Sequence, residues 1–321
     1  MLINLYKTKT PIAIITLPLL IAVLALQVFL VEIPTDSNVF SWESQFIEMI
    51  HQIPWLNFLL TTFIITLTAL QLNNVVNNYG FYSKNSYLPG FIYTLLLFTF
   101  NAFYFSWTIL VYALLSYGLG YLFKVNRQDC AKSPIFMASL LIGTAIALVP
   151  WLLPLFLLPI ITLILFRSFI WRELFLVLLG FILPWFYYFA IYFIVEGNLI
   201  FAQDGIILAP RVFDLNWLLL AFYSGILFLI LFSFWRFLIV MSGQLMRFKK
   251  RSKILFHFIW IALISTALNW YFYDVLLVAS IIPIAIILSV QILYVRNLLI
   301  YNVLISSWFI IVLVLRIVDL V

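Results

Sequence analysis

Apolar residues follow one another along this chain in long runs, and the charged residues fall in the short gaps between the runs. Many runs reach about 18 to 20 residues, which is the length of helix that crosses the hydrocarbon core of a bilayer. A water-soluble domain has too little surface to hide so much apolar material. The pattern therefore predicts an all-α protein whose helices cross a membrane many times.

The gaps between the runs predict where each helix starts and stops. The expected helices cover residues 11–32, 54–74, 88–101, 104–123, 134–149, 151–166, 173–195, 216–239, 254–271, 275–293 and 297–318. Proline stands near several starts, where its missing N–H leaves no hydrogen bond unmade. Two long runs are divided, one near Asn101 and one at Pro150. We therefore expect one polytopic membrane domain of about 10 to 11 spans, whose first helix is retained and not cleaved as a signal peptide.

Charge is scarce and unevenly placed. Charged residues make up 9% of the chain against 66% hydrophobic, and the net charge is +6. With the N-terminus in the cytoplasm, every Lys and Arg except Arg211 and Arg316 falls on the cytoplasmic side, which is the bias that sets orientation. Every Asp and Glu except Asp129 and Glu173 falls outside. This bias, with a composition rich in Ile, Phe, Leu and Asn, predicts a protein of a bacterial inner membrane that does not bind nucleic acid.

The expected spans carry no ionisable residue near their middle. Proton-coupled transporters need groups in the bilayer that bind and release protons, and cation channels need a polar pore lining, so both classes are disfavoured. Cys130 is the only cysteine and the chain has two histidines. Neither an intrachain disulfide nor a Cys/His zinc site is therefore expected.

Four asparagines crowd the inner end of the second expected span: Asn73, Asn74, Asn77 and Asn78. Their spacing predicts that they share one helical face. They would contact a lipid head group or a partner protein, or they would satisfy carbonyls at a helix end. We favour the helix-end interpretation.

The first outer loop predicts a short helix lying in the membrane interface. Apolar and polar residues alternate there at helical spacing, Ser41 is a candidate N-cap, and Trp42 and Trp55 are candidate interfacial anchors. The loop also carries three candidate catalytic acids, Glu32, Asp36 and Glu43.

The second outer loop places Arg211 between Asp204 and Asp214. Arg211 would pair with Asp214, or it would hold a phosphate through two parallel hydrogen bonds. The neighbouring carboxylates would then act as a base or bind a divalent metal. Together, the two loops predict a lipid-linked phosphate near Arg211 and an acid that takes the proton from an incoming hydroxyl.

This layout resembles the C-type membrane glycosyltransferases, the GT-C superfamily, which use polyprenyl-phosphate sugars. The resemblance covers residues 1–195 and rests on PTDSNVFSWESQFIEMIHQ, SWTILVYALLSYGLGYLFKV and LIGTAIALVPWLLPLFLLPIITLILFRSFIWRE. It implies a GT-C-like helical module followed by C-terminal helices over 196–321, with an acidic catalytic residue in the first outer loop. The chain departs from the family in its short first loop and in lacking a paired-Asp motif, which leaves a non-catalytic relative open.

Two functions remain in view. The chain would transfer a sugar from a polyprenyl-phosphate donor at the outer face during envelope biogenesis. Alternatively, it would be a non-catalytic membrane subunit that scaffolds a secretion, motility or envelope-assembly complex through lateral helix contacts. A lipid or small-molecule flippase is a weaker third option, because the spans carry no charge.

Overall fold

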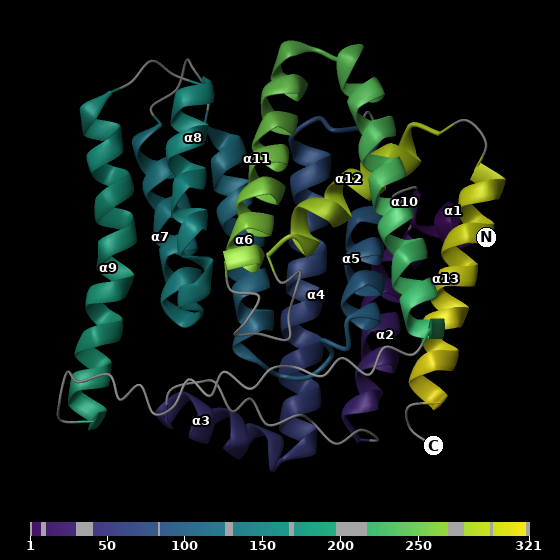
Figure 1. Ribbon diagram of the computed structural model, residues 1–321, viewed down its shortest axis with the longest axis horizontal. Helices are drawn as coiled ribbons and strands as arrows, with labels where there is room; N and C mark the ends of the chain where they lie inside the picture. The colour runs from purple at the N-terminus through teal and green to yellow at the C-terminus, as the bar shows by residue number, and fades with distance from the viewer. Residues whose placement is uncertain are drawn as a thin grey trace.

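The computed structural model describes residues 2–7, 11–29, 41–82, 84–125, 131–166, 170–196, 217–268, 279–295 and 298–318. Within these ranges every regular element is a helix and none is a strand, so the all-α class is confirmed (Figure 1). The elements in chain order are α1 Leu2–Lys7, α2 Pro11–Ala25, the 3-10 helix η1 Leu26–Phe29, α3 Ser41–His51, α4 Pro54–Asn78, α5 Leu88–Thr99, α6 Trp107–Lys124, α7 Lys132–Leu148, the 3-10 helix η2 Pro150–Phe156, α8 Leu157–Phe166, α9 Trp171–Glu196, α10 Trp217–Ser242, α11 Met246–Leu268, α12 Ile281–Leu293 and α13 Leu298–Val318.

The described helices fall close to the expected ones, with shifted ends. The largest shift is at the start of α11, which begins at Met246 and not at residue 254. Lys and Arg are good helix formers, so the helix extends into a basic segment that an apolar-run criterion excludes. The division at Pro150 is also observed, and there the chain forms the 3-10 helix η2 with Pro154 inside it. Proline supplies no N–H, so an α-helix cannot continue unbroken through this segment.

Four stretches in the described ranges are long and apolar enough to cross a membrane: Pro11–Phe29, Pro54–Asn78, Trp171–Val195 and Ser224–Ser242. Five shorter apolar helical stretches accompany them: Leu88–Thr99, Lys132–Leu148, Pro150–Phe166, Ile281–Leu293 and Leu299–Leu315. The structure therefore has the helices of a membrane protein. A total of about 10 to 11 spans stays a prediction.

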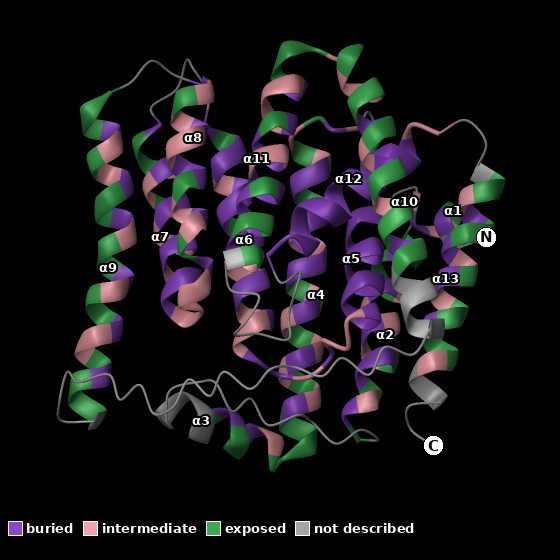
Figure 2. Cartoon of the chain, viewed as in Figure 1, coloured by how far each residue is buried: buried purple, intermediate pink, exposed green. Residues whose placement is uncertain are grey.

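The short helices α5 and α12 form the centre of the bundle. Every residue of both helices is buried, and the two helices pack against each other. By contrast, α9, α10 and α13 expose much of their length (Figure 2). Outer helices with apolar exposed faces are expected where the surroundings are lipid.

Helices α7 and α9 pack closely against each other through two glycines. A Cβ added at Gly180 would lie 2.9 Å from the Ser139 Cβ, and one added at Gly143 would lie 3.1 Å from the Phe181 Cα. Small residues at such contacts let helix backbones approach closely, which favours association in a membrane.

Helix α1 is held against α13. The Ile3 N–H donates to Asn302 Oδ1 at 3.1 Å, so an α13 side chain satisfies one of the free amides at the start of α1. The Tyr6 ring stacks on Phe91 of α5, with 4.6 Å between ring centroids. The first and last described helices are therefore fixed to the same core.

The two ends of the bundle differ in charge. Arg251 contacts the ends of α4 and α6, and Lys250 lies over the Phe166 ring at the end of α8. We call this the cationic end, the upper end in Figure 1. The described Lys and Arg side chains belong to it: Lys7, Lys84, Lys124, Lys132, Arg172, Arg236, Arg247, Lys249, Lys250, Arg251 and Lys253. Helix α3 lies across the opposite end, which we call the α3 end (Figure 1).

Candidate functional site

Helix α3 turns one apolar side to the bundle and its other side outward. Ile47 and Ile50 are buried, whereas Glu48 and Met49 are exposed. This division is that of an amphipathic helix lying in the plane of a membrane interface. The helix begins at Ser41, the residue predicted as its N-cap, and it places Glu43 in its first turn.

Asn57 and His51 fasten α3 and the start of α4 to the segment between α5 and α6. The His51 Nε2–H donates to the Phe105 carbonyl oxygen at 2.8 Å, because a carbonyl can only accept. The Phe105 N–H donates to Asn57 Oδ1 at 2.8 Å, and the Thr61 hydroxyl donates to the same oxygen at 3.1 Å. Asn57 is fully buried. The α3 end therefore has a rigid support under its interfacial helix.

The support at Asn57 was not predicted from the sequence. An asparagine near the start of an apolar helix gives no sign of its partner. Phe105 lies 48 positions away along the chain, and its contribution comes from backbone atoms that every residue type carries. Only the fold brings the two together.

Most of the predicted outer site lies outside the described residues. Glu32, Asp36, Asp204, Arg211 and Asp214 all belong to the segments 30–40 and 197–216. Their joint site, with Arg211 facing an acid, stays a prediction. The helices on either side of these segments nevertheless have their flanking ends at the α3 end, since η1 leads toward α3 and α9 ends there (Figure 1).

Two of the four clustered asparagines make structural contacts, buried for Asn73 and partly buried for Asn77. Asn73 Oδ1 accepts the Gly90 N–H at 2.7 Å. Asn77 accepts the Ser86 N–H at 2.9 Å and donates to the Ser86 carbonyl oxygen at 3.1 Å. The Ser86 hydroxyl in turn donates to the Tyr6 carbonyl oxygen at 3.1 Å. These amides join α4 to the start of α5 and to α1.

The other two asparagines, Asn74 and Asn78, are exposed. The expectation that all four share one face is therefore wrong. Successive helical residues are about 100° apart, so Asn74 points away from the side that Asn73 and Asn77 use. A contact of Asn74 or Asn78 with a head group or partner stays a prediction.

Arg251 contacts the ends of two helices inside the cationic end. Its Nη1 donates to the Tyr79 carbonyl oxygen at 2.6 Å, and its Nη2 lies 3.5 Å from the Phe123 carbonyl oxygen. These carbonyls stand at the C-terminal ends of α4 and α6, where unsatisfied acceptors and the helix dipoles attract a cation. Burial lowers the pKa of Arg251, and the neighbouring Arg247 lowers it further. The sequence marked Arg251 only as part of a basic loop.

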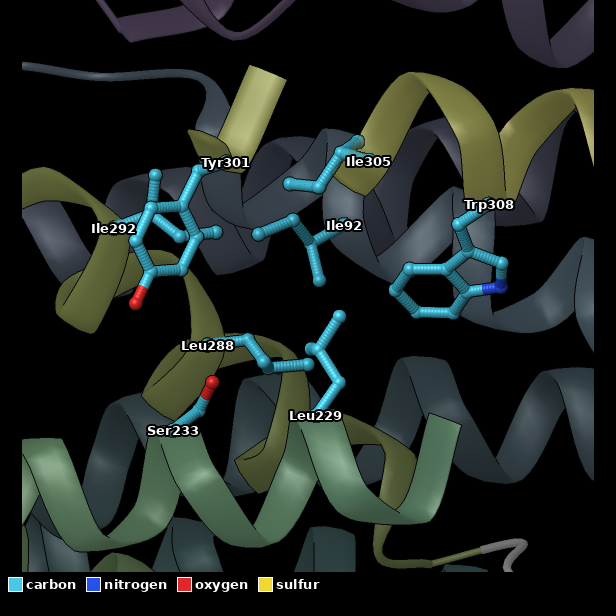
Figure 3. Close-up of a pocket in the computed structure, with 8 residues that line it drawn as sticks. All are labelled: Ile92, Leu229, Ser233, Leu288, Ile292, Tyr301, Ile305 and Trp308. Atoms are coloured by element: carbon cyan, nitrogen blue, oxygen red, sulfur yellow. The ribbon is translucent and has the colours of Figure 1, made fainter. Parts of the chain in front are cut away.

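A small hollow lies between α5, α10, α12 and α13 (Figure 3). Its lining residues are Ile92, Leu229, Ser233, Leu288, Ile292, Tyr301, Ile305 and Trp308. Its free volume is about 10 Å³, which is roughly the space of one water molecule. This hollow is therefore too small for a sugar or a phosphate donor.

Metal ligands do not gather in the described part of the chain. No group of three or more His, Cys, Asp and Glu side chains is close enough there to hold an ion. The predicted metal-binding carboxylates, Asp204 and Asp214, lie outside the described residues. Comparison of the chain with protein-family models, with curated proteins and with solved structures finds no match.

Proposed function

We propose that this chain is a multi-pass protein of a bacterial inner membrane that transfers a sugar from a polyprenyl-phosphate donor at the outer face. One observation carries the proposal. The segments holding the candidate acids and Arg211 attach at the α3 end, opposite the cationic end. Lys and Arg mark the cytoplasmic side of membrane proteins, so the α3 end is the outer one.

The proposed chemistry uses groups at the α3 end. Arg211 holds the donor phosphate bidentately, and Glu43, Asp36 or Glu32 takes the proton from the acceptor hydroxyl. The hydroxyl oxygen then bonds to the anomeric carbon as the bond from that carbon to the phosphate oxygen breaks. Helix α3, held by His51 and Asn57, provides a fixed edge for this reaction.

Native mass spectrometry of the gently extracted protein tests the transferase proposal. A retained polyprenyl phosphate or lipid-linked sugar is expected, and Arg211→Ala should lose it. Arg316→Ala is the matched control, because it removes the other arginine predicted on the outer side. Retention of the lipid by Arg211→Ala, or no such lipid in the wild-type protein, would contradict the proposal.

The second candidate function is a non-catalytic subunit of a membrane complex. The apolar faces of α9 and α10 favour it, since only 22% and 17% of their spanning windows are buried by the rest of the chain. These faces would contact partner helices as well as lipid. Stoichiometric partner proteins after mild extraction, together with no bound polyprenyl lipid, would support the subunit and oppose the transferase.

A further inference from the structure

The hairpin of α10 and α11 carries the densest cationic segment of the described chain. Residues 236 to 253 include six Lys and Arg and no Asp or Glu. They are Arg236, Arg247, Lys249, Lys250, Arg251 and Lys253. Arg251 contacts helix-end carbonyls inside the bundle, whereas Arg247 and Lys253 are exposed to the surroundings.

Lys250 lies beside the end of α8, and Arg247 lies near Arg251, which contacts the end of α6. The Lys250 Nζ is 5.4 Å from the centroid of the Phe166 ring at the end of α8. Arg247 is exposed and close enough to Arg251 to affect its pKa. Lys124 follows Phe123, whose carbonyl oxygen faces the Arg251 guanidinium. Several positive groups therefore converge where three helices end.

The hairpin itself supplies no carboxylate to offset these cations, because residues 236 to 253 contain no Asp or Glu. Among the described acidic side chains, Glu48 is on α3 at the opposite end of the bundle, and Glu173 is buried at the start of α9. A cluster of cations on one surface repels itself unless anions offset it.

The tip of the same hairpin is apolar. Leu245 is 80% exposed and Met246 is 73% exposed, and they lie directly before Arg247. The preceding stretch, Ser224–Ser242, is long and apolar enough to cross a membrane. The turn therefore stands at the bilayer surface, where apolar side chains enter the acyl region while cations meet phosphates. This position favours lipid over a soluble acidic protein.

We propose that the α10–α11 hairpin binds the phosphate head group of an anionic phospholipid, with Arg247 and Lys250 as the main ligands and Leu245 and Met246 among the acyl chains. The site is separate from the proposed transferase site at the α3 end. It holds whether or not the chain is an enzyme.

Native mass spectrometry with competing lipids tests this site. The full-length protein is incubated with phosphatidylglycerol and phosphatidylcholine of identical acyl chains, and the ratio of the two bound lipids is measured. Removing both ligands in Arg247→Gln/Lys250→Gln should lower the preference for phosphatidylglycerol about 25-fold, at about fivefold per cation. The conservative variant Arg247→Lys/Lys250→Arg should keep the preference.

The matched control is Lys132→Gln/Arg172→Gln, which removes the same charge from the starts of α7 and α9 at the cationic end. This control should keep the wild-type lipid ratio. Equal losses in the two double variants would show a general charge effect and overturn the site. An unchanged ratio in Arg247→Gln/Lys250→Gln would overturn it as well.

Discussion

A methyl group at Gly180 should force α7 and α9 apart. The added Cβ would lie 2.9 Å from the Ser139 Cβ and 3.0 Å from the Phe136 carbonyl oxygen. Carbon atoms pack best at about 3.5 to 4.0 Å, so the helices must separate by roughly 0.6 Å or more. Overpacking of this kind costs about 1 to 3 kcal/mol. Alanine has a higher helix propensity than glycine, which offsets about 1 kcal/mol of this cost.

The balance predicts that Gly180→Ala lowers the free energy of unfolding by up to about 2 kcal/mol. Gly180→Leu should lower it further, because a flexible side chain cannot move the backbone atoms that it meets. The assay is thermal unfolding of the purified protein in one detergent, followed by size-exclusion chromatography for the fraction that stays monodisperse.

Gly225→Ala is the matched control for this prediction. It also lies in a long apolar helix, α10, but beyond the local backbone of that helix no described atom lies within 4 Å of the position of its added Cβ. Gly225→Ala should leave the midpoint of thermal unfolding unchanged or raise it. A midpoint for Gly180→Ala equal to that of Gly225→Ala would refute the close contact between α7 and α9.

Three further predictions concern polar contacts. Asn57→Leu leaves the buried Phe105 N–H without its acceptor and should cost about 1 to 3 kcal/mol of unfolding free energy in chemical denaturation; a wild-type value would contradict the role of Asn57 under α3. Arg251→Gln removes a cation from the ends of two helices and should lower the free energy of unfolding by about 2 kcal/mol. Lys253→Gln changes an exposed cation on the same helix and should leave the free energy of unfolding unchanged. Burial raises the pKa of the Tyr79 hydroxyl, so its contribution to stability is present below its usual pKa of about 10 and is lost as pH rises further. Tyr79→Phe should therefore flatten the fall in melting midpoint above pH 10, and an unchanged slope would oppose this reasoning.

The positions of the helices could be predicted because the bilayer sets a minimum length for an apolar run. The run beginning at Pro54 shows both the strength and the limit of this reasoning. Its start is predicted to the residue, since proline suits the first turn. Its end lies at Asn78, four residues beyond the predicted 74, because Asn77 finds a partner in Ser86 that local sequence does not reveal.

Contacts between distant segments could not be predicted. The sequence identified a basic loop, but it could not show that Arg251 reaches back to Tyr79, 172 residues earlier. Equally, the short helix α1 lacks the length of a span, and its support comes from Asn302 near the other end of the chain. Such pairings depend on how helices are arranged, whereas periodicity reports only on each helix alone.

The central claim is that the cationic end and the α3 end lie on opposite sides of a membrane, and single-cysteine labelling tests it most directly. The natural Cys130 is first changed to serine, and cysteine is then placed at Met49 on α3 or at Lys249 on α11. In intact spheroplasts, a membrane-impermeant maleimide should label Met49→Cys at once and Lys249→Cys only after the membrane is permeabilised. Labelling of both positions from the same side, or of Lys249→Cys alone in intact spheroplasts, would contradict this account.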